Sequence, residues 1–258
     1  MISTMESIEE LDPDGQWWVH ERPFRHIRAQ NVLRKEAYAQ LEAAFAKIRD
    51  GTTATDKPQL QTRQGYDALM VAMTKQLAAE FAPLFDHRWI ALLARLLDLP
   101  LLPQVDGGLH HIPMGSRSGW VHNDYCSAWF DAGTEGDVVL PDRTKCDYFT
   151  GRPKADAARP REFIRAGTMI FYLDNGDWRP GAGGETGLYP TARAGIGTVT
   201  GIPPVSNSLL LFRCSPHSYH RLIANPGCAR NSIILWLHET VQHATGVWGN
   251  AVTRRKVT

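Results

Sequence analysis

Three residues in this sequence have the types and spacing of a mononuclear metal site. His122 and Asp124 lie two positions apart in GWVHNDYCSAWF, so on a strand both side chains would leave the same face. An imidazole and a carboxylate are two of the three ligands of a non-haem iron site, which a second histidine completes. His220, in SYHRLIANPGCARNS, is the candidate third ligand. A pair this short also arises by chance, so it needs support from the rest of the chain.

That support comes from two residues that follow His220. Arg230 lies ten positions after it and Ser232 two positions further, on the same face if the segment is a strand. A guanidinium can hold a carboxylate through two parallel hydrogen bonds, and a hydroxyl can donate a third. The fold therefore has to bring the segment around residue 122 next to the segment 218–232.

The elements before residue 105 are predicted to be mainly helical. Apolar residues at helical spacing predict helices over 35–48, 68–85 and 89–97. The last of these has an almost continuous apolar surface, which is typical of a helix that supports a sheet. Pro100 and Pro103 end it.

After residue 105 the pattern changes to about eight short strands separated by turn residues, which is typical of a sandwich or jelly roll. We expect one domain over 1–258, mostly β with flanking helices. Residues 1–104 form an N-terminal helical support on one side, and 105–240 form the catalytic core.

One long polar segment, residues 131–161, interrupts these strands. It contains six acidic and six basic residues, and its longest aliphatic run is 138–140. A loop of this length inside a domain is usually a functional lid or a disordered insert. Because it starts directly after the stretch that holds His122 and Asp124, we expect a lid.

Composition excludes several classes of protein. The chain is 43% hydrophobic and 21% charged with a net charge of +1, which is ordinary for a globular protein and argues against a nucleic-acid binder. Its four cysteines form no CxxC pair. We expect neither a signal peptide nor a membrane span, and a cytoplasmic location.

The ordered set of stretches GWVHNDYCSAWF, MIFYLDN, GGETGLYP, SLLLFRCSPHSYHRL and ARNSIILWLH resembles the Fe(II)/2-oxoglutarate-dependent dioxygenases, in the branch similar to prolyl hydroxylases. The resemblance runs from about residue 109 to 238, half of the chain. It implies a double-stranded β-helix (the cupin-like jelly roll) with iron at its mouth. It also implies oxidation of an unactivated C–H bond by O2, with decarboxylation of 2-oxoglutarate to succinate.

The resemblance also implies roles for individual residues. His122, Asp124 and His220 would be the metal ligands, and Arg230 would hold the far carboxylate of 2-oxoglutarate with Ser232 beside it. Tyr172, in IFYLDN, matches a tyrosine that such enzymes use as a further hydroxyl donor. Halogenating relatives have a small residue in place of Asp124, so its presence points away from halogenation.

Substrate contacts are predicted only by their position near the mouth of the expected barrel. Glu185, in GGETGLYP, would face a substrate amine or cap a turn, and the two interpretations are equally supported. The predicted substrate-binding residues are His110, Arg117, Tyr125, Trp129, Trp178, Glu185 and His217.

The sequence thus predicts a small-molecule hydroxylase whose substrate is an amino acid or a biosynthetic intermediate, with no nucleic-acid or membrane partner. One alternative keeps the chemistry and makes the substrate a prolyl or other side chain of a protein. A second alternative, from another class, is a cupin-like barrel that binds a metal or ligand without catalysis. Arg230 and Ser232 argue against that last alternative, because a metal binder needs no anchor for a 2-oxo acid.

Overall fold

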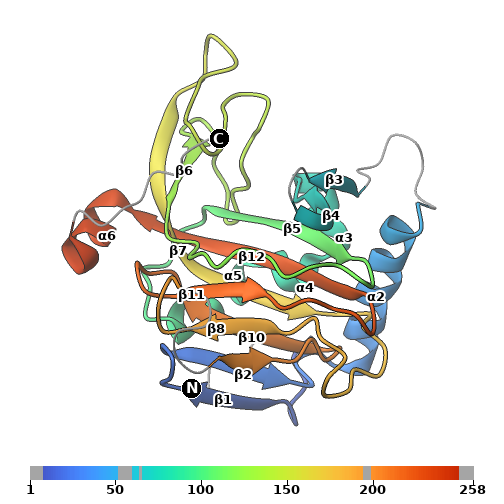
Figure 1. Ribbon diagram of the computed structural model, residues 1–258. Helices are drawn as coiled ribbons and strands as arrows, with labels where there is room; N and C mark the ends of the chain where they lie inside the picture. The colour runs from blue at the N-terminus through green and yellow to red at the C-terminus, as the bar shows by residue number, and fades with distance from the viewer. Residues whose placement is uncertain (1–7, 52–59, 64–65, 194–198, 250–258) are drawn as a thin grey trace.

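The computed structural model describes residues 8–51, 60–63, 66–193 and 199–249 (Figure 1). Helices and strands follow one another in the order β1 (Gln16–His20), β2 (His26–Gln30), α2 (Lys35–Arg49), β3 (Gln61–Arg63), β4 (Tyr66–Ala72), α3 (Lys75–Glu80), α4 (Ala82–Phe85), α5 (His87–Leu96), β5 (Val105–Ile112), β6 (Ser127–Asp131), β7 (Pro160–Tyr172), β8 (Thr186–Tyr189), β9 (Thr200–Ile202), β10 (Ser208–Arg213), β11 (Tyr219–Leu222), β12 (Arg230–Thr240) and α6 (Val241–Trp248).

Two antiparallel sheets form the core. The large one has the strand order β1-β2-β10-β7-β12-β5-β4-β3, with β6 paired to β7, and the small one has the order β11-β8-β9. Figure 1 shows the small sheet in front of the large one, with α3, α4 and α5 behind. Two facing antiparallel sheets with helices on one side confirm the predicted jelly-roll core.

The residues of β7 and β12 alternate between two environments. Met169 and Phe171 of β7, like Ile233 and Leu235 of β12, belong to the hydrophobic core shared with the helices. The residues between them, such as Ile170, face the small sheet and pack with its residues. We call this second side the interior face, and the period of two along a strand decides which residues reach it.

The N-terminal region is less helical than its sequence predicts. Helices α2 and α5 confirm the predictions for 35–48 and 89–97, and α5 buries its apolar residues against the large sheet. The predicted helix over 68–85 is wrong in its first part, because residues up to Ala72 form β4 and pair with β5. Pairing with a neighbouring strand has overridden the local preference there.

No helix in the described part of the chain has the length and apolar character needed to cross a bilayer.

The 131–161 insert projects above the large sheet between β6 and β7 (Figure 1). The sequence of the insert is polar, but Val139, Leu140 and Tyr148 are buried. The backbone of the insert is also attached to β5, because the carbonyl of Val139 accepts a hydrogen bond from Val105 N (3.0 Å). The base of the insert is therefore packed on the core. That the insert acts as a lid stays a prediction.

Candidate metal centre

His122 and His220 are brought together by backbone pairing between two distant segments. His122 lies in the link between β5 and β6, and it forms an isolated antiparallel bridge with His220 of β11. His122 N donates to His220 O (3.0 Å), and His220 N donates to His122 O (2.8 Å). The expectation that His122 and Asp124 share a regular strand is wrong, because β6 begins only at Ser127. Asp124 lies in irregular backbone.

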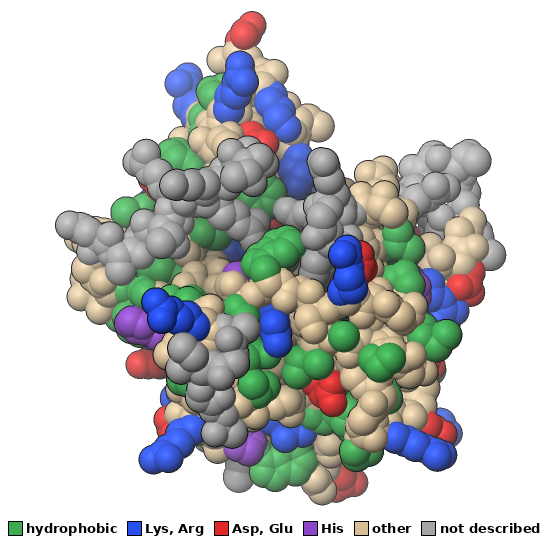
Figure 2. All heavy atoms as spheres, viewed as in Figure 1, with side chains coloured by type: hydrophobic (Ala, Val, Ile, Leu, Met, Phe, Trp, Pro, Cys, Tyr) green, Lys and Arg blue, Asp and Glu red, His purple; other side chains and the backbone are tan. Residues whose placement is uncertain are grey.

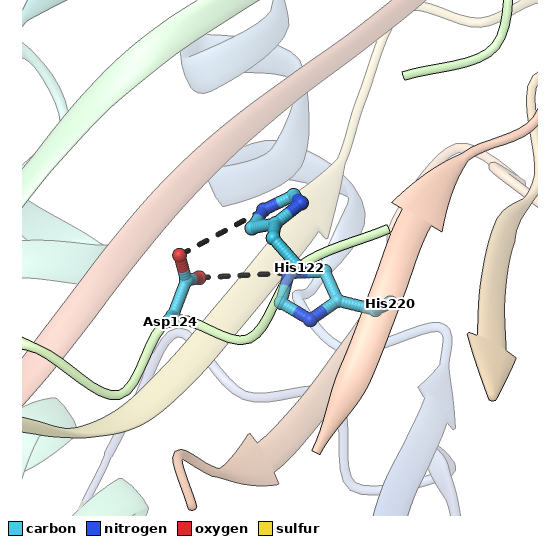
Figure 3. A group of neighbouring side chains, drawn as sticks. All are labelled: His122, Asp124 and His220. Atoms are coloured by element: carbon cyan, nitrogen blue, oxygen red, sulfur yellow. Dashed lines mark ion pairs between the residues drawn. The ribbon is translucent and has the colours of Figure 1, made fainter. Parts of the chain in front are cut away.

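The three side chains nevertheless converge (Figure 3). One potential ligand atom from each of His122, Asp124 and His220 lies within 4.8 Å of the others. The distance from His122 Nε2 to Asp124 Oδ1 is 3.9 Å, and from His220 Nε2 to Asp124 Oδ2 it is 3.6 Å. Asp124 and His220 are 5% and 7% exposed, whereas His122 is 33% exposed, so the group opens on the His122 side. We call this group the metal end.

Both imidazoles have a fixed tautomer. His122 Nδ1 lies 3.0 Å from Trp120 O, and His220 Nδ1 lies 3.1 Å from Ser218 O. A carbonyl only accepts hydrogen bonds, so each Nδ1 carries the proton and donates it. This leaves the lone pair of each Nε2 on the side of Asp124, which is the arrangement that metal-binding histidines need.

The Asp124 carboxylate is held by three residues of the large sheet. Its Oδ2 accepts hydrogen bonds from Trp236 Nε1 (2.8 Å) and Thr168 Oγ1 (3.1 Å), while Arg165 lies 3.6 Å from Oδ1. Burial acts to raise the pKa of Asp124, but its contact with His220 and the nearby charge of Arg165 outweigh burial. The pKa therefore lies well below its usual range, and the carboxylate is charged, as a metal ligand must be.

A second polar cluster, which we call the carboxylate end, lies on the same interior face. Arg230, the first residue of β12, donates from Nη2 to Thr186 Oγ1 (3.0 Å). The Thr186 hydroxyl also forms a hydrogen bond with the Tyr172 hydroxyl (2.7 Å). Ser232 is fully buried and pairs in register with Tyr172 on β7. These four residues surround one small polar region.

The carboxylate end has donors left over. Arg230 is 4% exposed, yet its Nε has no hydrogen-bond partner among the described residues, and neither has the buried hydroxyl of Ser232. None of the ion pairs found between described residues involves Arg230, so its charge has no protein counter-ion there. A buried charge and buried donors without partners are unfavourable. A ligand carboxylate would satisfy both residues, so the residues present fit a 2-oxo diacid.

Alternation along β7 connects the two ends. Thr168 contacts the metal end, Tyr172 belongs to the carboxylate end, and both are on the interior face because four residues separate them. Four residues of strand span about 13 Å. Apolar side chains of Ile170, Leu188 and Ile234 lie between the two sheets. Figure 2 shows a hollow over β11 and β12 in which an imidazole is visible beside hydrophobic side chains.

Two glycines let the chain pass the carboxylate end closely. Gly183 and Gly184 have φ values of +78° and +80°, which favour glycine. A Cβ on Gly183 would lie 2.1 Å from Ala224 O, and one on Gly184 would lie 3.6 Å from Arg230 Cβ. The two glycines of GGETGLYP therefore bring β8 close enough for Thr186 to reach Arg230.

The predicted substrate-binding residues separate into different places. His110 is buried and pairs in register with Ser232, so it lies on the interior face. Trp178 is not free to contact a substrate with its ring nitrogen, because Nε1 donates to Gly183 O (2.8 Å). His217 is exposed in the turn before β11. His110 is therefore the one of these three that the fold places inside.

The other four predicted substrate contacts are explained by packing or surface pairs. Arg117 is exposed and forms an ion pair with Asp67. Tyr125 is buried in a cluster with α6. Trp129 packs against Gly151 of the insert. Glu185 lies over Gly201, on the opposite side of β8 from Thr186.

Four residues at the two ends were not predicted from the sequence. Thr186 directly follows Glu185, which the sequence analysis predicted as a substrate contact. Alternation along the strand of Arg230 does not tell which of these two neighbours faces Arg230. Thr168 and Trp236 lie an even number of positions from Tyr172 and Arg230, a signal that would have found them. Arg165 has no such signal, because its role depends on packing.

Comparison with known proteins gives one family match and many structural ones. Residues 142–238 match the family model described as 2OG-Fe(II) oxygenase superfamily. A solved prolyl hydroxylase from Trichoplax adhaerens, in complex with a hypoxia inducible factor peptide fragment, is similar at TM-score 0.54 and 13% identity over 85% of this chain and 86% of that one. The non-heme alpha ketoglutarate dependent carbocyclase SnoK from nogalamycin biosynthesis is similar at TM-score 0.51 and 13% identity, over 86% and 85%. No curated protein matches the sequence.

At these identities the structural likeness shows the fold. The family match covers His220 and Arg230 but begins after Asp124, so it contains one histidine of the metal end and the arginine of the carboxylate end. That His122 and Asp124 belong to the same site rests on the geometry described above.

Proposed function

We propose that this chain, which by its family match and fold is a 2-oxoglutarate-dependent dioxygenase, hydroxylates an unactivated C–H bond of a small molecule. Its cofactors are Fe(II), 2-oxoglutarate and O2. The observation that carries the proposal is the pair of sites on one interior face. A three-ligand metal end and a buried arginine without a counter-ion among the described residues lie at the two ends of the same space.

The residues of the metal end would hold Fe(II) through His122 Nε2, His220 Nε2 and the Asp124 carboxylate. Three protein ligands leave the remaining positions of the metal for the 2-oxo acid and oxygen. When bound, iron would bring O2, the oxidant, together with 2-oxoglutarate; one oxygen atom would end in succinate and the other in the hydroxyl group of the product, with release of CO2. The protein fixes the ligands, because each Nδ1 is held by a carbonyl and Asp124 by Trp236 and Thr168.

The residues of the carboxylate end would orient 2-oxoglutarate. Arg230 would donate to its far carboxylate through Nε and Nη, and Ser232 and Tyr172 would add hydroxyl donors. Thr186 would hold the guanidinium in place from the other side, since it already accepts from Nη2. Burial of the cluster excludes water and strengthens each of these contacts.

Two observations bear on the substrate class. The similarity to a carbocyclase of nogalamycin biosynthesis supports a small molecule, and the similarity to a prolyl hydroxylase with a bound peptide supports the alternative of a protein side chain. His110 supports a small molecule, because it places a polar side chain inside the barrel.

We also infer a reducing, cytoplasmic location, which the four free cysteines support.

The experiment measures succinate formation in the presence of Fe(II), first without a substrate and then with amino acids, biosynthetic intermediates and a proline-containing peptide. Stimulation by a small molecule and not by the peptide is the expected result. Stimulation by the peptide alone would support the protein hydroxylase. A protein that binds Fe(II) yet forms no succinate with any candidate or without one would contradict the enzyme and favour a binding protein.

The same assay, run at several 2-oxoglutarate concentrations, compares the parent with Arg230→Ala, for which Arg221→Ala is the matched control. Arg221 also stacks on a tyrosine, with its Cζ 5.2 Å from the Tyr189 ring, which is the distance between Arg230 Cζ and the Tyr172 ring. Its neighbours His220 and Leu222 are the buried residues of β11, so Arg221 points away from the interior face. Arg221→Ala should leave the 2-oxoglutarate dependence of succinate formation unchanged.

A further inference from the structure

Arg165 of β7 is a buried charge that the proposed function does not use. Its side chain is 2% exposed, and its guanidinium carbon lies 3.8 Å from the centre of the Trp236 ring. On other sides it faces Tyr148 and Phe149 of the insert, at 5.3 and 5.8 Å. Burying an arginine is costly unless its charge and its donors are matched. The residues that contact the Arg165 guanidinium therefore indicate its role.

The three nitrogens of the guanidinium point to three different residues. Nη1 lies 3.6 Å from Asp124 Oδ1, and Nη2 lies 3.7 Å from Asp106 Oδ2. Nε donates to the Tyr148 hydroxyl at 3.0 Å. Arg165 thus lies between a proposed metal ligand, a buried carboxylate of β5 and a residue of the insert.

The hydrogen bond to Tyr148 has a defined direction. His238 Nδ1 lies 3.0 Å from Gln104 O, so this nitrogen carries the proton and donates it. Burial and the charge of Arg165 lower the pKa of His238 to about 3, so the ring is neutral and its Nε2 accepts from the Tyr148 hydroxyl at 2.9 Å. The hydroxyl oxygen is then free to accept from Arg165 Nε. The insert therefore fixes Arg165 from the side opposite the metal end.

The two oxygens of Asp124 have different surroundings. Oδ2 accepts from Trp236 and Thr168, which are both neutral donors, and Oδ1 faces Arg165 and His122. Trp236 is also the residue on which the Arg165 guanidinium stacks. A change in the position of Arg165 would alter the contacts of both oxygens at once.

We propose that Arg165 is a positioning residue for Asp124, and that the insert acts on the metal end through Tyr148 and Arg165. The inference rests on the proposed function, since it takes Asp124 as a metal ligand. In the proposed arrangement, Arg165 and Trp236 set the rotation of the carboxylate, and Tyr148 sets Arg165. The base of the insert is then a fixed part of the metal site.

The test uses Co(II) added to the full-length metal-free protein, because its visible absorption reports the geometry of its ligands. The variants are Arg165→Lys, Arg165→Met and Tyr148→Phe. Replacing residues behind metal ligands typically weakens metal binding roughly 10–100-fold. We expect Arg165→Lys and Arg165→Met to weaken Co(II) binding at least about 10-fold and to change its visible spectrum. Tyr148→Phe, which leaves the charge in place, should change the spectrum in the same direction by less.

Two matched controls separate this effect from general damage. Arg161→Lys changes another arginine of β7 that stacks on an aromatic ring, 5.2 Å from the centre of Phe163. Tyr189→Phe removes another tyrosine hydroxyl that accepts from an arginine Nε, that of Arg221 at 2.8 Å. Neither residue contacts Asp124, so both variants should bind Co(II) with the affinity and spectrum of the parent.

Four cases decide the outcome. Parent-like affinity and spectrum in folded Arg165→Lys and Tyr148→Phe would overturn the inference. Tighter Co(II) binding in Arg165→Met would also overturn it, because Arg165 would then act by repelling the metal. If Arg165→Met does not fold, Tyr148→Phe decides by itself. If His220→Ala binds Co(II) as the parent does, the metal end itself is wrong and the proposed function fails.

Discussion

At the carboxylate end, Arg230 and Ser232 lie on a regular strand, whereas at the metal end His122 and Asp124 lie in irregular backbone. The sheet hydrogen bonds of β12 and β7 position Arg230, Ser232 and Tyr172 directly. Asp124 has no such support, and its carboxylate is held by side chains. A site built on a strand depends on the sheet, while a site built on a link depends on the residues packed around it.

The two ends also differ in how far the protein itself supplies hydrogen-bond partners for their buried polar groups. The carboxylate of Asp124 has two hydrogen bonds and a nearby arginine from the protein itself. Arg230 and Ser232 keep donors without partners among the described residues. The metal end is therefore preorganised by the protein alone, and the carboxylate end is completed by its ligand. Four predictions, taken from the largest effect to the smallest, test this comparison.

The largest effect is expected from removing a metal ligand. Asp124→Ala or His220→Ala should abolish succinate formation and the binding of one Fe(II) per chain, with the fold retained. Both side chains belong to the candidate metal-binding group found among the described residues, which has three members, so losing either leaves only two ligands. Iron content and succinate are measured, with His87→Ala, which changes an exposed histidine of α5, as the control. Full activity of a metal-free His220→Ala protein would contradict the metal end.

Arg230→Ala should weaken 2-oxoglutarate binding and leave metal binding nearly unchanged. A charge-assisted hydrogen bond contributes about 1.5–3 kcal/mol, so the dissociation constant should rise roughly 10- to 150-fold for each bond lost. Arg230→Lys should recover only part of this loss, because an ammonium keeps the charge without the bidentate geometry. The measurement is a titration with 2-oxoglutarate. If Arg230→Ala binds as tightly as the parent, the carboxylate end has been assigned wrongly.

Acid should destabilise the metal-free protein through His238, which supports the metal end from behind. Its pKa is lowered to about 3 by burial, so the unfolded chain takes up a proton below about pH 6.5 that the folded protein does not. Unfolding free energy should therefore fall with decreasing pH between about 6.5 and 3, by at most about 1.4 kcal/mol per pH unit from this group. Chemical denaturation at several pH values, for the parent and His238→Gln, measures the difference. Equal slopes in the two proteins would count against a buried neutral His238.

The smallest effect is expected at Ser232. Ser232→Ala should weaken 2-oxoglutarate binding by about 0.5–1.5 kcal/mol, since it removes one neutral donor while Arg230 remains. The buried hydroxyl has no partner among the described residues, so the variant should be at least as stable as the parent without ligand. Titration and thermal unfolding test both statements. A loss of stability without a loss of affinity would show that Ser232 serves packing alone.

Residue types and spacing were enough to predict His122, Asp124, His220, Arg230 and Ser232, because a metal site and a carboxylate site each require particular chemical groups. Tyr172 was added by the family resemblance. Alternation along a strand also predicts that Ser232 shares a face with Arg230. The same pattern could not place Glu185, since a one-residue shift at the start of β8 decides whether Glu185 or Thr186 faces Arg230.

Tertiary structure decided the rest. Residues 68–72 have a helical pattern and form a strand because β5 offers a pairing edge. Tyr125 follows the proposed metal ligand Asp124 in sequence and packs against α6. Arg165 stands 41 positions after Asp124 and reaches it only because β7 passes beneath the link and the insert closes over the guanidinium. The chemical group of each side chain is given by its residue type, so the sequence alone shows which residues could bind a metal or a carboxylate. A buried charge is positioned by everything packed around it, so its role is readable only in the folded molecule.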